Sequence, residues 1–354
     1  MSFWEKITVT HRSITILIIV YFVVHLINLT LLPIFNDESI YIDWGWSHTH
    51  MPGHLYDALL DAKQPLMIWL FGFFQNFFSD PLYAGRFISV LIGSITLLGI
   101  YKLSVKLLNK NVAILASIIY IIVPIFVFYN RQALLEAGIA CVGIWSCIAL
   151  INVVKNPSIK NSIALGTILA TGFFIKSSSL LFIVAATSIL AFFIWKKKQL
   201  TLLKAYGIAL LTFFCVDFLL FINPVFWETF HTNSRYAFTL SELFTFPVTS
   251  WINNLLGFFE IGIVFVTPVI FLVSIIGMYL FYKKKVKHSL IFLSFFVIAL
   301  LLEILSGKMQ GQRYLVSFLP FLVVLASYVF YLLWQGALWK KTLVIISLSI
   351  PLVL

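Results

Sequence analysis

The amino-acid sequence predicts an all-α, polytopic membrane protein, and three observations support that fold class. Of its 354 residues, 61% are hydrophobic and only 10% are charged, whereas soluble domains have about 25% charged residues. Apolar runs long enough to span a bilayer, about 17–25 residues each, recur along the whole chain. These runs are continuous rather than alternating, and backbone inside lipid must satisfy its own hydrogen bonds, so helices are expected.

We expect about eleven membrane segments from these runs. The final run stays apolar for about 13 residues up to Leu354, which is short for a crossing. A truncated fragment of a longer protein is therefore one interpretation of the chain. The expected segments cover residues 13–32, 83–103, 112–129, 133–152, 160–175, 177–195, 202–221, 257–281, 288–306 and 314–334, with a last one beginning near 342.

Two polar stretches interrupt the apolar runs and are expected outside the membrane. The first outer loop covers residues 33–81, and the second outer loop covers residues 223–256. Within the first, residues 65–78 are apolar and aromatic but too short to span, which is typical of an interfacial helix. Because the sequence has no internal repeat or low-complexity linker, a single transmembrane domain over residues 1–354 is the simplest organisation.

The placement of charge orients these segments. With the N-terminus in the cytoplasm, 17 of the 24 basic residues fall on the cytoplasmic side, as the positive-inside rule expects. The net charge of +11 therefore does not indicate nucleic-acid binding. Twelve of the 13 acidic residues fall on the other side. Lone charges beside apolar runs, such as Glu136, Lys176 and Glu303, are costly at membrane depth and predict an outward-facing cavity of mixed charge in the plasma or inner membrane.

The first motif with chemical potential is residues 36–41 (NDESIY), directly after the first segment. The adjacent carboxylates of Asp37 and Glu38 fit a catalytic base, a metal site or the acidic cap of a short helix. The dipeptide alone leaves these alternatives open.

The second motif is residues 61–66 (DAKQPL), followed by Trp69. Lys63 precedes the interfacial helix, where a phosphate would meet both an ammonium group and the positive end of a helix. A snorkelling interfacial lysine has the same pattern, so this alternative also stays open.

Three further motifs carry single charges at outer helix ends. Arg131 and Glu136 are five positions apart, so they are not neighbours along one helix face. The three motifs are residues 129–136 (YNRQALLE), residues 172–177 (GFFIKS) with Lys176, and residues 312–314 (QRY) with Arg313 and Tyr314.

In this order and on one side, the motifs resemble the polyprenyl-phosphate-sugar glycosyltransferases of the GT-C fold, especially the protein O-mannosyltransferase and lipid A aminoarabinose transferase group. That group carries Asp-Glu and Tyr after its first helix, then Lys-Pro-Pro-Leu, Arg-x-Ala-Leu-x-Asp/Glu and a later Lys. The resemblance covers about residues 30–180, with Gln64 in place of a proline and Glu136 where many relatives have Asp. The matching residues are Asp37, Glu38, Tyr41, Lys63, Pro65, Leu66, Arg131, Ala133, Leu134, Glu136 and Lys176.

The resemblance implies an inverting glycosyltransferase that moves a sugar from a polyprenyl-phosphate donor to a hydroxyl of an acceptor protein or glycan, on the non-cytoplasmic side. Asp37 would be the general base, with Glu38 and Glu136 as further catalytic carboxylates. Positive charge would stabilise the departing lipid phosphate. The residues assigned to that phosphate are Lys63, Lys176, Arg313 and Arg131, and those assigned to the substrate are Tyr41, Trp69 and Tyr314.

The first outer loop also carries three closely spaced histidines, His48, His50 and His54. No cofactor is certain from the sequence, but these residues would suit a divalent metal, with Asp43 or Asp57 as a further ligand. Three solvated histidines are the competing interpretation. Aminoarabinose transferases carry a metal-binding Glu where this chain has Ala62, and Arg86 is expected to support the loop.

Two other classes of function compete with the transferase. A lipid or sugar transporter would also carry charges within its membrane segments, usually near the midplane and between repeated halves. Here the charges gather near one membrane surface, and no repeated halves are visible. An inactive truncated fragment or scaffold is the second alternative, because the chain stops within an apolar run.

Overall fold

The computed structural model describes residues 3–308 and 311–352. Every regular element in these ranges is helical, apart from one isolated antiparallel bridge between Ala237 and Gly307. The elements are α1 (Phe3–Leu26), α2 (Asn36–His50), η1 (Asp57–Asp61), α3 (Leu66–Gln75), α4 (Pro81–Leu107), α5 (Lys110–Ile122), α6 (Pro124–Tyr129), α7 (Glu136–Lys155), α8 (Ile159–Ile175), η2 (Ser177–Ser179), α9 (Leu180–Lys197), α10 (Leu200–Val216), α11 (Phe218–Phe221), α12 (Pro224–Asn233), α13 (Leu240–Leu243), α14 (Val248–Phe265), α15 (Pro268–Lys283), α16 (Ser289–Ser306), α17 (Gln312–Leu315), α18 (Leu319–Trp334), α19 (Leu338–Ser349) and η3 (Ile350–Leu352).

The lengths and composition of these helices confirm an all-α, multi-pass membrane protein. Among the described residues, five helical stretches are long and apolar enough to cross a bilayer: Pro81–Leu107, Glu136–Lys155, Ser177–Lys196, Val248–Phe265 and Ser289–Ser306. A further seven apolar helices are shorter, with 10–17 residues each. Their exposed faces carry large apolar side chains, as expected where lipid rather than water surrounds the helices.

Several predicted membrane segments are interrupted in the structure: 112–129 is divided between α5 and α6, 202–221 between α10 and α11, and 314–334 between α17 and α18. The largest departure is at residues 257–281. Residues 257–281 are not a single helix but parts of α14 and α15, which meet at a sharp bend. Thr267 has a φ of 77° at this bend, and Pro268 begins α15. The rings of Phe258 and Phe271 lie 5.6 Å apart, whereas 13 residues of straight helix would separate them by about 20 Å. The predicted second outer loop also ends earlier, because α14 begins at Val248.

Local signals in the sequence explain where several helices begin. The side chain of Asp80 accepts a hydrogen bond from the backbone N–H of Leu82 at 2.9 Å, and Pro81 takes the first position of α4. Both are typical of a helix N-terminus. Asn109 and Ser158 cap α5 and α8 in the same way. These helix starts follow from residues that the chain carries locally.

The core of the bundle is built around α7, which packs against α4, α8 and α9. Glycines let these helices approach closely, as is common between membrane helices. Gly99 of α4 lies against Ile144 and Trp145 of α7, and Gly143 of α7 lies against Phe182 of α9. The first residue of this central helix is Glu136, so the packing fixes the position of a carboxylate.

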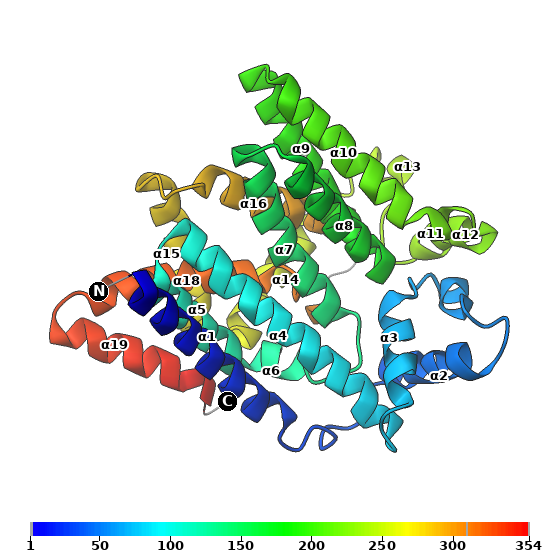
Figure 1. Ribbon diagram of the computed structural model, residues 1–354, viewed down its shortest axis with the longest axis horizontal. Coiled ribbons are helices and arrows are strands. Elements are labelled where there is room, and N and C mark those ends of the chain that lie inside the picture. The colour runs from blue at the N-terminus through cyan, green and yellow to red at the C-terminus, as the bar shows by residue number, and fades with distance from the viewer. Residues whose placement is uncertain (1–2, 309–310, 353–354) are drawn as a thin grey trace.

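The helices of the first outer loop lie together at one end of the bundle. Figure 1 shows α2, α3 and α12 on one side of the view, while the turn between α18 and α19 lies on the opposite side. Within the loop, α2 and α3 touch through backbone, because Gly45 and Gly72 face each other at the crossing. An added Cβ on Gly72 would stand only 2.0 Å from the Gly45 carbonyl oxygen. This contact fixes the crossing of α2, which carries Asp37, and α3, which follows Lys63.

Candidate active site

A buried carboxylate at the start of α7 joins two cations from distant parts of the chain. Glu136 is 1% exposed, and its Oε1 accepts hydrogen bonds from Nζ of Lys176 at 2.9 Å and from Nε of Arg313 at 3.0 Å. Its second oxygen, Oε2, has no partner among the described residues. Glu136 therefore anchors both cations, and one of its oxygens stays free for a further donor.

Asp37 completes this cluster through Arg313. Nη1 of Arg313 donates to Oδ2 of Asp37, so one guanidinium bridges the two carboxylates. The side chain of Asp37 is 29% exposed, against 1% for Glu136. Burial opposes the charge of Arg313, but the nearby Glu136 and Asp37 outweigh it and raise the Arg313 pKa above its usual value. Because Asp37 is the more exposed of the two carboxylates, it is the one that a substrate can reach.

Two tyrosines extend the cluster toward Lys63. Nζ of Lys176 lies 5.4 Å from the ring centre of Tyr314, and Nζ of Lys63 lies 5.7 Å from that of Tyr236. Burial raises the pKa of Tyr314, and the nearby Tyr236 adds to this rise. Both ammonium groups thus have cation–π partners rather than a carboxylate alone. Lys63 also approaches its neighbour Asp61, with Nζ at 3.5 Å from Oδ2.

Hydrogen bonds of neutral side chains connect the segments that carry Lys63 and Lys176. Oε1 of Gln64 accepts a hydrogen bond from the backbone N–H of Ser177 at 2.9 Å, which ties the first outer loop to the turn after Lys176. Nδ2 of Asn233, at the end of α12, donates to Oγ of Ser177 at 3.3 Å. Gln64 stands where the family pattern has a proline. A proline could not accept the hydrogen bond from Ser177, so this bond gives a structural reason for glutamine at this position.

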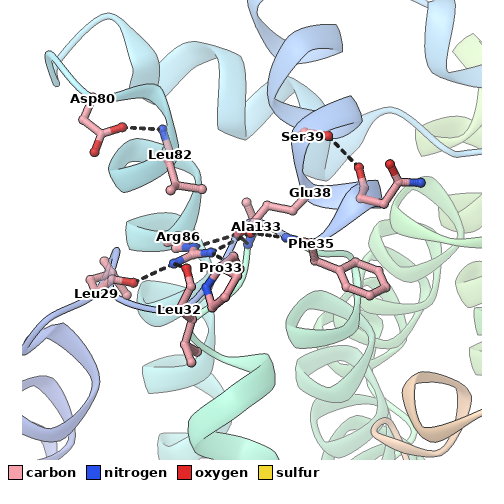
Figure 2. A network of polar contacts seen from close by, with 11 residues as sticks. Leu29, Leu32, Pro33, Phe35, Glu38, Ser39, Asp80, Leu82, Arg86 and Ala133 are labelled. Carbon is pink, nitrogen blue, oxygen red and sulfur yellow. Dashed lines mark hydrogen bonds and ion pairs between the residues drawn. The ribbon is translucent and has the colours of Figure 1, made fainter.

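Glu38 does not share the environment of Asp37, although the two are adjacent in sequence. It is fully buried, and its two oxygens accept from Nε of Arg86 at 2.8 Å and from Nη2 at 2.7 Å (Figure 2). The backbone N–H groups of Ala133 and Phe35 add two more hydrogen bonds. This arrangement favours a structural role for Glu38 over the catalytic role expected from the sequence. The other hydrogen bonds of Arg86 go to the carbonyls of Leu29, Leu32 and Pro33, so it supports the loop as expected.

Arg131 also serves the backbone. Its Nη2 donates to the carbonyls of Ile27 and Asn28 at 2.8 Å and 2.6 Å, just after α1 ends. A cation suits the carbonyl end of a helix. This use of the guanidinium favours a positioning role over the phosphate-binding role that the sequence suggested.

The aromatic residues assigned to the substrate divide into two groups. Tyr41 is 1% exposed. Its hydroxyl has no hydrogen-bond partner among the described residues, and burial raises its pKa. Tyr314 lies at the cluster under Lys176. Trp69 instead packs inside the first outer loop, where its Nε1 donates to the carbonyl of Leu55 at 2.7 Å and its ring stacks on His48. Tyr314 is thus better placed than Trp69 to meet a substrate, whereas Tyr41 is buried.

The three histidines do not converge. Nδ1 of His50 bonds to the carbonyl of Trp46, Nδ1 of His54 bonds to Asp57, and His48 stacks on Trp69. Burial lowers the pKa of His48. In the part of the chain that the structure describes, no group of three or more His, Cys, Asp or Glu residues could hold a metal ion. The side chains present therefore do not form the metal site that the triplet suggested.

One residue of the cluster, Tyr236, went unrecognised in the sequence. It lies in the second outer loop without any motif around it, and its contact with Lys63 reveals it. Glu303, which the sequence marked as a lone charge in an apolar run, lies near the end of α16 and is 8% exposed.

The chain is similar to known proteins in part of its sequence and in its fold. Residues 62–227 match the family model described as dolichyl-phosphate-mannose-protein mannosyltransferase. No curated protein gives a significant match. Among solved structures, ArnT from Cupriavidus metallidurans bound to undecaprenyl phosphate is similar with a TM-score of 0.69 and 13% identity, over 99% of this chain and 64% of that one.

Solved structures of an archaeal oligosaccharyltransferase are also similar in fold. The Archaeoglobus fulgidus enzyme in complex with zinc and sulfate gives a TM-score of 0.69 and 12% identity, over 96% of this chain and 51% of that one. AglB from Archaeoglobus fulgidus, in complex with an inhibitory peptide and a dolichol-phosphate, gives a TM-score of 0.59 and 11% identity. The match covers 98% of this chain and 55% of AglB. This chain therefore spans about half to two thirds of the length of these proteins. Its predicted resemblance to GT-C glycosyltransferases is confirmed, and it has their fold.

Proposed function

We propose that this protein transfers a sugar from a polyprenyl-phosphate donor to an acceptor hydroxyl, with inversion at the anomeric carbon. The observation that carries the proposal is the bridging of Asp37 and Glu136 by Arg313, with Lys176 on the same Glu136 oxygen. A reachable carboxylate and two cations therefore stand together at one position. The reaction needs this combination, because it removes a proton at one atom and leaves a lipid phosphate at another.

The cations of the cluster suit a phosphate anion. Lys176 and Arg313 share the Glu136 carboxylate, and Lys63 lies beside Asp61 and the ring of Tyr236. A sugar joined to a lipid through a phosphodiester carries one negative charge, to which these ammonium and guanidinium groups would donate hydrogen bonds. Lys176 and Arg313 are 17% and 21% exposed, so their amino and guanidinium groups are partly open to such a ligand.

In the proposed reaction Asp37 accepts the proton of the acceptor hydroxyl as its oxygen attacks the anomeric carbon. The new carbon–oxygen bond forms while the bond from that carbon to the phosphate oxygen breaks, and the lipid phosphate leaves with the bonding electrons. Arg313 turns from Asp37 toward the departing phosphate, so the base is released as the leaving group is stabilised. Attack from the face opposite the phosphate inverts the sugar carbon.

The proposed side of the membrane follows from charge. The cluster lies at the end of the bundle away from the basic turns between α9 and α10 and between α15 and α16, which the positive-inside rule places in the cytoplasm. Transfer would therefore take place on the non-cytoplasmic face. The donor's prenyl chain would lie among the apolar helices of this chain; ArnT binds undecaprenyl phosphate, and AglB binds a dolichol-phosphate.

A matched pair of variants tests the base. Asp37→Asn keeps the size of the side chain and removes its basicity, and Asp43→Asn makes the same change at an exposed position of the same helix. In liposomes supplied with a hydroxyl-bearing acceptor and with dolichyl-phosphate mannose or, separately, undecaprenyl-phosphate aminoarabinose, release of the lipid phosphate is the measurement. We expect Asp37→Asn to lose at least about 100-fold in rate and Asp43→Asn to keep full activity.

The same assay distinguishes a transferase from a transporter. Donor that crosses the liposome bilayer without any cleavage of its phosphate–sugar bond would favour transport. Transfer that survives Asp37→Asn unchanged, in a variant with native thermal stability, would reject Asp37 as the base.

A further inference from the structure

A second recess lies away from the charged cluster, between α5, α18 and α19. It has a volume of about 510 Å³, and its lining is almost entirely apolar. Ile118 and Leu348 face it from the two sides, and Tyr331 and Trp334 line its end at the α18–α19 turn. None of the residues assigned to sugar transfer contributes to it. We call this recess the α5–α19 groove.

The length of the groove matches one leaflet of a bilayer. Its wall on α5 runs from Asn111 to Ile122, which is about 16 Å of helix at 1.5 Å per residue. Half of a hydrocarbon core of about 30 Å is about 15 Å. An extended acyl chain that enters from one membrane surface would therefore be covered over the full depth of its leaflet.

The entrance of the groove carries positive charge and interfacial aromatic rings. On α19 the groove-facing residues Val344 and Ile345 lie four and three positions before Leu348, so both share a helix face with it. Lys341 stands three positions before Val344 and continues that face toward the α18–α19 turn, beside Lys340. Nζ of Lys340 lies 5.3 Å from the ring centre of Trp339. Lysine and tryptophan together are typical of the level of lipid headgroups.

We propose that the α5–α19 groove binds a phospholipid with an anionic headgroup. One acyl chain fills the apolar recess, while Lys340 and Lys341 hold the phosphate and the negative headgroup at the entrance. In the described part of the chain neither lysine has a carboxylate partner, and the ion pairs found there lie elsewhere. This lipid site is separate from the proposed donor site, which uses α2, α7 and α17 at the other end of the bundle.

Native mass spectrometry of the purified full chain tests the proposal. The delipidated protein is titrated with palmitoyl-oleoyl phosphatidylglycerol, which is anionic, and with the phosphatidylcholine of the same chains. We expect one tightly held phosphatidylglycerol and a preference of tenfold or more over phosphatidylcholine, since each lysine near a lipid surface contributes about fivefold. Bound lipid should also raise the temperature of unfolding, because it binds only the folded state.

Variants on one helix separate the groove from the general lipid surface. Leu348→Trp fills the recess, whereas Leu343→Trp adds the same bulk to an exposed position of α19 outside it. Retention of phosphatidylglycerol should fall at least tenfold for the first and stay native for the second. Ile118→Trp fills the groove from α5 and serves if Leu348→Trp fails to fold.

The headgroup contacts have their own control. Lys340→Gln with Lys341→Gln should reduce the affinity for phosphatidylglycerol to that for phosphatidylcholine, whereas Lys285→Gln with Lys287→Gln makes the same charge change at another basic turn and should have no such effect. Equal binding of both lipids by the native chain would overturn the proposal. It would also fail if the groove-filling variants kept their lipid, or if a second copy of the chain occupied the groove and appeared as a dimer in the spectrum.

Discussion

Glu136 and Arg313 are joined by a hydrogen bond of 3.0 Å, although 177 positions separate them in the sequence. One comes from the central helix of the bundle and the other from the short helix α17. Lys176 shares the same carboxylate oxygen. The cluster therefore exists only when three remote segments have packed together, and its assembly reports on the fold of the whole domain.

Removal of the shared carboxylate should damage both stability and transfer. Glu136→Ala leaves Lys176 and Arg313 without their buried partner, and breaking a buried ion pair costs roughly 3–5 kcal/mol. We expect the free energy of unfolding, from denaturant titration in mixed micelles, to fall by about that amount, with transfer lost. Glu228→Ala in α12, which is exposed, is the control and should change neither quantity. Unaltered stability of Glu136→Ala would contradict the central role of this carboxylate.

The pair of Glu38 and Arg86 should prove structural rather than catalytic. Arg86→Lys keeps the charge but loses the fork that reaches both oxygens of Glu38, so this substitution is not conservative. We expect Arg86→Lys and Glu38→Gln each to lower the unfolding free energy by about 3 kcal/mol or more. The loss from the double variant should be well below the sum of the two single losses.

One outcome would contradict the structural role of Glu38. If Glu38→Gln were as stable as the native protein and yet inactive per folded molecule, Glu38 would be a catalytic residue.

The crossing of α2 and α3 should tolerate no side chain. Gly72→Ala places a Cβ 2.0 Å from the Gly45 carbonyl oxygen, so the two helices must separate. Asp37 lies in α2, and Lys63 lies between α2 and α3. Separating the two helices should therefore displace these residues, and we expect both lower thermal stability and a transfer rate reduced more than tenfold. Gly207→Ala is the matched control, since nothing lies within 4 Å of its added Cβ. It should be neutral or stabilising by up to about 1 kcal/mol.

The clasp between the second outer loop and Lys308 should resist acid. Oε1 of Glu242 accepts from Nζ of Lys308 at 2.7 Å, and this bond, with those from Thr239, lowers the Glu242 pKa from 4.5 to about 2. A carboxyl whose folded pKa is lowered adds stability above its unfolded pKa, and this contribution is lost as the pH falls through the folded value. The clasp should therefore begin to weaken below about pH 4.5 and open fully only near pH 2.

Hydrogen exchange at Phe238 and Lys308 measures this clasp, because their N–H groups bond to Ser306 and Tyr236 across it. After correction for the intrinsic pH dependence of exchange, protection in the native chain should hold from pH 7 to about pH 4.5 and decline toward pH 2. Glu242→Gln should show weakened protection at every pH. Loss of protection in the native chain near pH 6 would show that another group controls the loop.

The sequence alone determined the class of the protein and much of its site. Long continuous apolar runs admit only helices in lipid, and the positive-inside rule predicts their orientation. The costly single charges at Glu136, Lys176 and Arg313 marked the residues that meet in space. The bend at Thr267 escaped this reasoning, because apolar composition continues through α14 and α15 while only the backbone changes direction.

The tertiary structure decided which charges meet and which serve the scaffold. Asp37 and Glu38 are adjacent and chemically alike, but they point to different environments, one toward Arg313 and the reachable cluster and the other toward buried Arg86. Arg131 was equally suited to a phosphate, yet the end of α1 takes its hydrogen bonds. Residue type and spacing fix what a side chain can do. Burial and the partners within about 3 Å fix what it does, and those depend on segments far away in the chain.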